Sequence, residues 1–257
     1  MRISKTNNGI LGFLEKHIRK HPLLYIFFRS IIRFTNIFEK DFDGLKLINF
    51  RHNINVIDVG ASDGIAVNFF IKNLNVNKVI CFEPYKKFIN ILKQNKKIII
   101  KPYAIGNSNK KIKIFFPRYF FFYNYFDLIT YAHYDLDLLK HFIKDFKFRK
   151  NLKIVSTVIK IRKIKNINYK IDLIKIDTNG YELEIIKGLI NIIKKNKPIL
   201  IIEINKDHKI ISNLLKKYNY DSFYYSINKK KFLKKPDKNS TNKYFFQKNL
   251  IMRNYIN

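Results

Sequence analysis

The sequence predicts an α/β fold, in which a largely parallel β-sheet is covered by helices on both faces. From Asn55 onward, short apolar runs alternate with longer segments of helical periodicity, which is the pattern of parallel strands joined by helical crossovers. One of these runs, Ile199-Leu-Ile-Ile-Glu-Ile204, is apolar almost throughout, as a central strand buried on both faces should be.

The first half of this region alternates regularly. Its predicted elements are strand Val56–Val59, helix Ile65–Leu74, strand Val79–Phe82, helix Phe88–Gln94 and strand Ile98–Ala104. Pro102 lacks the N–H that a ladder between two neighbours requires. The strand that contains it is therefore expected at an edge of the sheet.

A long aromatic segment then interrupts the alternation. Short strands are predicted at Ile112–Phe116 and Val155–Ile161, and residues 118–150 between them are interpreted as an insertion with a helical second half. Seven of the eight residues from Tyr119 to Phe126 are Phe or Tyr. Because aromatic faces stack on flat ligand surfaces, the insertion is a candidate cover for a bound ligand. The alternative is that it only packs on the sheet.

The second half resumes with strand Ile171–Asp177 and a helix that begins near Tyr181 and is stopped by Pro198. Acids in the first turn of this helix and lysines in its last turn suit the helix dipole. The strand Ile199–Ile204 follows. Two aromatic stretches, Phe223–Ile227 and Tyr244–Ile251, are predicted to close the domain as an antiparallel pair.

Residues 1–45 are predicted to form a helical extension of the domain 46–257. The segment His21–Phe38 combines Leu, Ile and Phe with interspersed arginines, as a basic amphipathic helix does. Such a helix either docks on its own domain or lies on a membrane surface. Arg29 and Arg33 interrupt the apolar residues, so it is not expected to span a bilayer.

Composition excludes several classes of protein. At 257 residues and 47% apolar content the chain can bury a substantial core. The single cysteine, Cys81, excludes a disulfide scaffold and fits a reducing compartment. There is no run of eighteen apolar residues and no secretory signal. A cytoplasmic location is predicted, with membrane association through the N-terminal helix left open.

The formal net charge of +32 invites a nucleic-acid partner. However, 42 of the 51 basic residues are Lys, and Ile, Asn, Phe and Tyr are enriched as well, as codons rich in A and T would produce. The lysines are also spread along the whole chain. No specific nucleic-acid partner is predicted from charge, although the attraction to anionic surfaces remains real.

A glycine loop indicates the cofactor. In Val56-Ile-Asp-Val-Gly-Ala-Ser-Asp-Gly64 a strand enters a turn before a helix, and a second strand ends nineteen residues later at Glu83. A dinucleotide would require glycine where Ser62 and Ile65 stand. S-adenosylmethionine has a ribose for the carboxylate but no phosphate, so it makes no such demand. The alternative is a simple helix cap at Ser62 or Asp63.

Four acids recur at the C-terminal ends of predicted parallel strands, where α/β sheets bind ligands. They are Asp58, Glu83, Asp177 and Glu203. No metal site is predicted, because the histidines, His133, His141 and His208 among them, show no ligand spacing. Motifs of serine hydrolases and P-loop enzymes are absent.

Four sequence blocks occur in an order known from one enzyme family. They are Val56–Gly64, Cys81–Pro84, Tyr103–Gly106 and Ile171–Glu182. In these blocks the chain resembles the FkbM-type methyltransferases, which are S-adenosylmethionine-dependent O-methyltransferases. The resemblance implies a Rossmann-like, seven-stranded methyltransferase sheet with an antiparallel final strand.

The resemblance also implies roles for single residues. The cofactor would be bound by Asp58, Gly60, Ala61, Ser62, Gly64, Glu83, Tyr103 and Ala104. Asp177 would face the sulfonium or the acceptor, and Glu203 is the second candidate for catalysis. Asn179, Glu182 and His133 are the residues expected at the substrate. The family usually has Glu where this chain has Asn179, which implies an altered substrate or impaired catalysis.

The predicted function is methyl transfer to a hydroxyl group of a small molecule or glycan, such as a surface polysaccharide precursor. Two alternatives stay open. One is an RNA methyltransferase, which the charge favours and the absence of an Asn/Asp-Pro-Pro-aromatic motif disfavours. The other is an impaired methyltransferase-fold module that binds anionic membranes or polymers.

Overall fold

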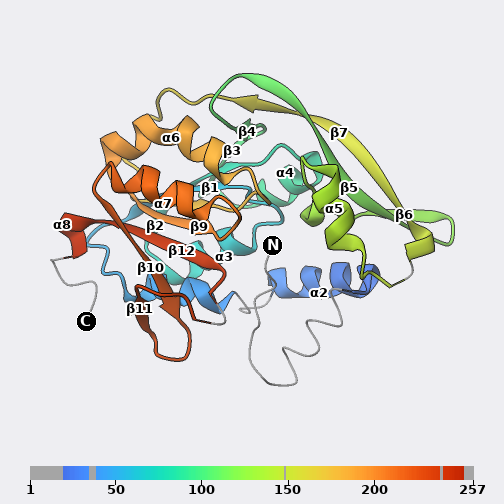
Figure 1. The fold of residues 1–257 in the computed structure, drawn as a ribbon, viewed down its shortest axis with the longest axis horizontal. Coiled ribbons are helices and arrows are strands. Elements are labelled where there is room, and N and C mark those ends of the chain that lie inside the picture. The colour runs from blue at the N-terminus through green and yellow to red at the C-terminus, as the bar shows by residue number, and fades with distance from the viewer. Residues whose placement is uncertain (1–19, 35–38, 148, 238–239, 252–257) are drawn as a thin grey trace.

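The computed structural model describes residues 20–34, 39–147, 149–237 and 240–251, and it has the predicted α/β architecture (Figure 1). An eight-stranded sheet has the order β11-β10-β12-β9-β8-β1-β2-β3. Its strands are β1 (Ile54–Val59), β2 (Val76–Phe82), β3 (Ile98–Lys101), β8 (Leu173–Ile176), β9 (Ile199–Glu203), β10 (Tyr220–Ser226), β11 (Lys231–Leu233) and β12 (Asn242–Gln247).

The five strands from β3 to β9 are mutually parallel. β12, the last strand along the chain, pairs antiparallel with β9 and with β10. The predicted closing pair is therefore present. The count of seven strands is wrong by one, because the Lys-rich loop between β10 and β12 contains β11, a strand of only three residues that pairs with β10.

Helices cover both faces of this sheet. On one face, the 3₁₀ helix η1 (Lys40–Leu47) and α3 (Ile65–Asn73) pack Phe42, Leu45, Phe69 and Phe70 into one apolar cluster. On the other face, α6 (Glu182–Asn196) and α7 (His208–Lys216) contribute to a second cluster. Strand residues alternate between the two clusters, because successive side chains of a strand point to opposite faces. Shorter helices are α4 (Lys86–Leu92) and α8 (Lys248–Ile251).

The third predicted strand is divided between two sheets. β3 ends at Lys101 and forms the edge of the main sheet, as Pro102 predicts. Beyond the proline the chain turns away, and Ala104–Ile105 forms β4, which pairs with β7 (Leu152–Arg162) in a separate sheet. The residue that fixes the edge thus also ends the strand.

The predicted insertion at 118–150 begins inside a strand. β5 (Lys110–Phe121) pairs with β7 over ten residues and continues into β6 (Asn124–Asp127), giving the sheet order β4-β7-β5-β6. Alternating polar and apolar residues explain why β5 is longer than expected. The helical second half is η2 (Ile129–Tyr131), α5 (Leu136–Ile143) and η3 (Arg149–Asn151). Leu139 and Ile143 of α5 pack against Tyr119 of β5.

The N-terminal helix α2 (Pro22–Phe34) is docked on the domain. Its Tyr25 ring lies 5.1 Å from that of Tyr131, and the Lys147 amide donates to the Lys20 carbonyl at 2.8 Å. The predictions for residues 1–19 and 35–38 lie outside the described residues. In the described part of the chain, no helix is both long and apolar enough to cross a bilayer.

Two glycines, Gly106 and Gly188, lie in close contact. A side chain added at Gly188 in α6 would collide with the carbonyl oxygen of Gly106, the residue after β4. The contact sets how closely α6 approaches the β4 segment. A glycine inside a helix normally costs about 0.5–1 kcal/mol relative to Ala, so the close approach is the reason for its presence.

We therefore expect Gly188→Ala to destabilise the fold by about 1–3 kcal/mol, although the same change in an open helix position would stabilise it. The free energy of unfolding in urea measures this. Asn191→Ala, on the exposed side of the same helix, is the matched control and should be neutral or stabilising. An unchanged or raised stability of Gly188→Ala would contradict the contact.

Candidate active site

A cavity opens at the carboxyl ends of the parallel strands. Eight of the thirteen residues expected at the site line it. They are Gly60, Ser62, Glu83, Ala104, His133, Asp177, Asn179 and Glu203. The glycine loop, the strand-end acids and the middle of the insertion are thus brought together, as the arrangement of a parallel sheet predicts.

The glycine loop has the left-handed backbone that its sequence suggests. Gly60 and Gly64 have φ values of +78° and +83°, and a side chain at Gly60 would meet the Asp177 carbonyl and Thr178. Gly64 is the N-cap of α3. Ser62 also has a positive φ, and its buried hydroxyl has no hydrogen-bond partner among the described residues. An unpaired buried hydroxyl in a cavity wall indicates that a ligand completes the site.

Glu83 is held rigidly beside this loop. One carboxylate oxygen accepts a hydrogen bond from the Ser62 amide at 2.9 Å, and the other accepts one from the Tyr85 amide at 2.8 Å. Burial raises the pKa of Glu83 to about 7, and the two backbone donors limit the rise. Each oxygen keeps acceptor capacity toward the cavity.

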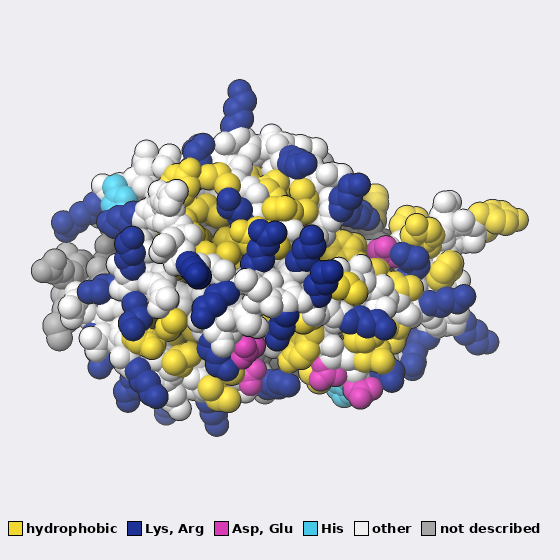
Figure 2. All heavy atoms as spheres, turned by 90° about the horizontal axis from the view of Figure 1, so that it is seen from above, with side chains coloured by type: hydrophobic (Ala, Val, Ile, Leu, Met, Phe, Trp, Pro, Cys, Tyr) yellow, Lys and Arg dark blue, Asp and Glu magenta, His cyan; other side chains and the backbone are white. Residues whose placement is uncertain are grey.

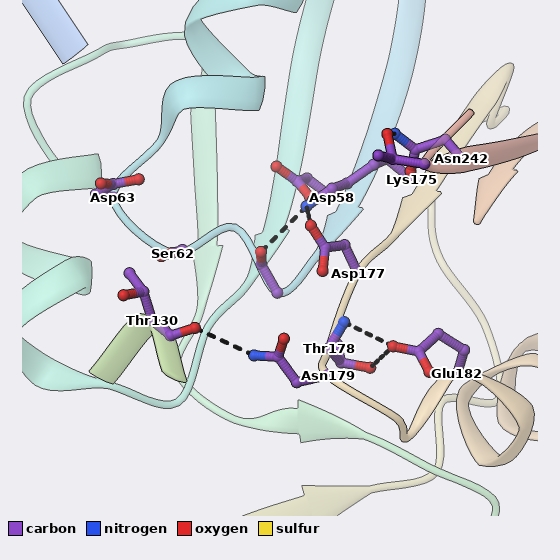
Figure 3. Close-up of polar contacts among 12 residues, drawn as sticks. Asp58, Ser62, Asp63, Thr130, Lys175, Asp177, Thr178, Asn179, Glu182 and Asn242 are labelled. Atoms are coloured by element: carbon purple, nitrogen blue, oxygen red, sulfur yellow. Dashed lines mark hydrogen bonds and ion pairs between the residues drawn. The ribbon is translucent and has the colours of Figure 1, made fainter. Parts of the chain in front are cut away.

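A buried ion pair lies beneath the cavity floor. Lys175 stands opposite Asp58 in the β1–β8 register, and its Nζ lies 3.1 Å from Asp58 Oδ1 and 3.7 Å from Asp177 Oδ2 (Figure 3). The ammonium also donates to the Gly60 carbonyl at 3.2 Å. Burial opposes its charge, but the carboxylates of Asp58 and Asp177 outweigh this and raise the pKa of Lys175.

Asp177 and Glu203 form a second acidic group above this pair. Each lies one residue beyond the last pair of the β8–β9 register, Ile176 with Ile202. Burial, then the charge of Asp177, raises the pKa of Glu203 well above its usual value. Burial and the neighbouring carboxylate thus favour the neutral form of Glu203.

Asn179 fastens the insertion over the cavity. Its Nδ2 donates to the carbonyls of Thr130 and Ala132 at 3.3 and 3.2 Å (Figure 3). His133, the residue after Ala132, is buried, and its Nδ1 accepts a hydrogen bond from the Asp135 amide at 2.8 Å. Burial lowers the pKa of His133, so the ring is neutral and carries its proton on Nε2.

Glu182, expected at the substrate, is fully buried and lies behind the cavity wall. Oε1 accepts from the amides of Thr178 and Gly180 and from the Thr178 hydroxyl, and Oε2 accepts from Asn205. These contacts fix the turn that carries Asn179. In this structure Glu182 positions the loop and does not face a ligand.

The N-terminal segment completes the cavity, which the sequence did not indicate. Arg29 of α2 forms a two-pronged ion pair with Asp63 of the glycine loop, at 2.6 and 2.9 Å. Arg29 and Tyr25 both line the cavity. In η1, Asp41 accepts hydrogen bonds from the amides of Thr241 and Asn242, which lie at the cavity as well.

Comparison with known proteins identifies the family. A family model described as "Methyltransferase FkbM domain" matches residues 58–222. The chain belongs to the FkbM methyltransferase family. A crystal structure of the methyltransferase FkbM from Methylobacillus flagellatus is similar at 18% identity and a TM-score of 0.50, covering 78% of this chain and 45% of that one. The present chain thus spans less than half of that protein's length.

A structure of TrmK from M. capricolum with S-adenosyl-homocysteine shares 13% identity at a TM-score of 0.38, and the match covers 84% of this chain and 69% of that one. The comparison with curated proteins gives no match.

The other five of the thirteen residues expected at the site do not line the cavity. Glu182 is one, and Asp58, Ala61 and Gly64 lie beneath its floor. Tyr103 faces a neighbouring groove, where the Arg162 guanidinium lies 4.7 Å from its ring centre. The chain turns at Pro102, which places Tyr103 in this groove and outside the cavity lining, and its contact with adenine stays a prediction. In the described residues, no three potential metal ligands cluster.

Lys175 is the functional residue that the sequence reasoning overlooked. It stands inside the block Ile171–Asp177, and a lysine within an otherwise apolar central strand was the available signal. Removing one partner of a buried ion pair leaves an uncompensated charge.

Lys175→Met should therefore destabilise the protein by about 3–5 kcal/mol, and lower Tm by roughly 10 °C for a chain of this size. Thermal unfolding measures the change. Combining it with Asp58→Asn should restore much of the loss, because neither charge then remains unpaired. Lys195→Met on the exposed side of α6 is the control. Additive losses in the double variant would mean that the pair is not coupled.

Proposed function

We propose that the protein is an S-adenosylmethionine-dependent O-methyltransferase that acts on a hydroxyl group of a sugar or glycan. The observation that carries this is the charge of the cavity. Among the described residues, its acidic side chains are Glu39, Glu83, Asp177 and Glu203, against the single cation Arg29, although the whole chain carries +32. An acidic cavity in a basic protein fits a cationic cofactor and an uncharged acceptor.

The residues present fit this cofactor. Glu83 offers two anchored carboxylate oxygens to a ribose diol, and the unpaired Ser62 hydroxyl lies beside it. Phe82, Ala104 and Ile105 supply an apolar wall for a purine. Asp177 also lines the cavity. Its negative charge favours a sulfonium.

When bound, S-adenosylmethionine supplies an electrophilic methyl group. Transfer of this group to the acceptor oxygen would require the hydroxyl proton to leave, so a residue of the cavity would have to accept it. We assign this role to Asp177, which lines the cavity at the end of β8. Lys175 holds Asp177 from below at 3.7 Å, which keeps the carboxylate oriented.

The charge of the cavity also favours a sugar acceptor over RNA, the alternative substrate. A phosphate backbone brought to the ionised carboxylates of the cavity would be repelled, whereas hydroxyl groups donate hydrogen bonds to carboxylates. The segment Ile129–Tyr134 contributes to the wall above Asp177. We propose that this segment, held by Asn179, covers the acceptor. The aromatic tip of the insertion does not line the cavity.

Cofactor affinity should depend on pH through Glu83. A ribose diol donates to the charged carboxylate, so binding requires the deprotonated form. With a pKa of about 7, that form is mostly lost at pH 6, and the Kd for S-adenosylmethionine should be roughly tenfold higher there than at pH 8. Isothermal titration calorimetry measures both values.

Glu83→Gln should bind at least about tenfold more weakly and show no such pH dependence. Asp221→Asn, a surface acid paired with Lys234, should behave as wild type. A pH dependence that persists in Glu83→Gln would assign the titration to another group. No binding of S-adenosylmethionine at any pH would refute the proposed function.

The acceptor is tested by transfer of radiolabelled methyl groups to a carbohydrate fraction and to RNA from the same source cells. We expect alkali-stable label in carbohydrate, as an ether gives, and none in RNA. Asp177→Asn should slow transfer by about 10²–10⁴-fold, while the Kd for S-adenosyl-homocysteine, which lacks the sulfonium charge, changes little. Label in RNA alone, removed by ribonuclease, would replace the sugar acceptor with its rival.

A further inference from the structure

Exposed hydrophobic side chains are concentrated in two segments. Of the twelve large ones among the described residues, eight lie in α2 and in the β5–β6 hairpin. They are Leu24, Phe27, Phe28 and Ile31 in α2, and Phe121, Phe122, Tyr123 and Tyr125 in the hairpin. A bias in overall composition would scatter such residues along the chain, so the concentration points to a local role.

The hairpin tip projects beyond the body of the protein (Figures 1 and 2). Phe122 and Tyr123 are 84% and 103% exposed, and Phe122 packs on Phe121 at a ring distance of 4.6 Å. Phe122 occupies a left-handed turn position with φ +52°, where a β-branched or bulky residue is unusual. Aromatic rings therefore stand at the outermost point of the ribbon, outside the cavity lining.

Helix α2 exposes an apolar stripe to solvent. Leu24, Phe27, Phe28 and Ile31 follow the i, i+3, i+4, i+7 spacing of one helix face, and all four are exposed. Tyr25 and Arg29 point to the domain, where Arg29 pairs with Asp63. A helix that only docks on its own domain would show the reverse, with the apolar stripe inward.

Cations surround the hairpin tip. Residues 118–127 and 149–153 hold four of them, Arg118, Arg149, Lys150 and Lys153, and one acid, Asp127. The Arg118 guanidinium lies 4.2 Å from the ring centre of Tyr125 and pairs with Asp127, and the Lys153 ammonium lies 5.2 Å from the ring of Phe120. The tip thus combines exposed rings with a net positive flank.

We propose that the β5–β6 hairpin tip and the outer face of α2 dock the protein on an anionic lipid bilayer. Aromatic side chains are favoured at the level of the headgroups, and flanking cations are attracted by anionic lipids. The rings enter the interface while Arg118, Arg149 and Lys153 contact the headgroups. The docking leaves the methyl-transfer site unchanged and does not depend on the proposed reaction.

A second copy of the chain fits these surfaces less well. Two chains of charge +32 repel each other, whereas an anionic bilayer attracts both segments. The tip of a two-stranded ribbon is convex, and it presents less than the roughly 800 Å² per partner of a standard protein interface. A soft headgroup layer accepts a convex tip without a complementary pocket.

The chain contains no tryptophan, so a single one reports its own surroundings. Phe122→Trp should show a blue-shifted emission with vesicles of phosphatidylcholine and phosphatidylglycerol in a three-to-one ratio, and bromolipids should quench it. Tyr169→Trp, at an exposed ring outside both segments, should show neither effect. An unchanged emission of Phe122→Trp on bound vesicles would overturn the role of the tip.

Co-sedimentation with the same vesicles measures affinity. The pairs Phe122→Ser with Tyr123→Ser, and Phe27→Ser with Phe28→Ser, should each reduce partitioning about tenfold or more, as expected when buried apolar area is lost. Tyr169→Ser should bind as wild type. Equal binding of all variants would mean that diffuse positive charge alone attracts the protein, which refutes the proposal. A blue shift of Phe122→Trp that appears without lipid as protein concentration rises would assign the surface to a second copy.

Discussion

The ion pair between Asp58 and Lys175 is the interaction on which the rest of the site depends. Parallel strands that end together place their terminal acids side by side, and here three of them, Asp58, Asp177 and Glu203, converge at one edge. Such a group is unfavourable in a buried place unless a cation compensates it. Lys175 supplies that charge from within β8, at 3.1 Å from Asp58. Lys175 also donates a hydrogen bond to the Gly60 carbonyl. The same ammonium group therefore holds both the acidic group and the glycine loop in position.

The walls of the cavity come from parts of the chain that have no place in the central sheet. Arg29 joins α2 to Asp63 of the glycine loop, and Asp41 joins η1 to Thr241 and Asn242 beside Glu203. Asn179 connects the insertion to the sheet through its hydrogen bond to the Ala132 carbonyl. In each contact a polar side chain meets a loop backbone group or an opposite charge. A buried polar group without such a partner would cost free energy of folding. The site is therefore closed by polar contacts between segments far apart in sequence, on a floor that the parallel strands provide.

This division explains what the sequence could predict. Periodicity and the end of β3 at Pro102 depend on neighbouring residues, so the parallel core, the edge strand and the closing pair β10–β12 were predictable. The meeting of Glu83, Asp177 and Glu203 followed from the rule that parallel strands end at one edge. The partners of Arg29, Asp41 and Asn179 lie between 34 and 201 residues away, and a single sequence contains no signal for such pairs. The cofactor contact of Tyr103 is implied by the resemblance alone, and its neighbours in sequence do not show that its ring faces the groove that holds Arg162.

The departure from the FkbM pattern at Asn179 has a structural explanation. The backbone here is left-handed, with φ +54°, a conformation that Asn tolerates better than most residues. Its amide donates two hydrogen bonds to the carbonyls of Thr130 and Ala132, which a carboxylate, being only an acceptor, could not do. The negative charge that a Glu would add is already supplied at the cavity by Asp177 and Glu83. The substitution therefore replaces what would be a fifth acid at the cavity with an amide that holds the covering segment in place. Because Glu182 still holds the turn through Thr178 and Gly180, the position of residue 179 is maintained while its chemistry changes, and the effect of the departure is expected in the choice of acceptor.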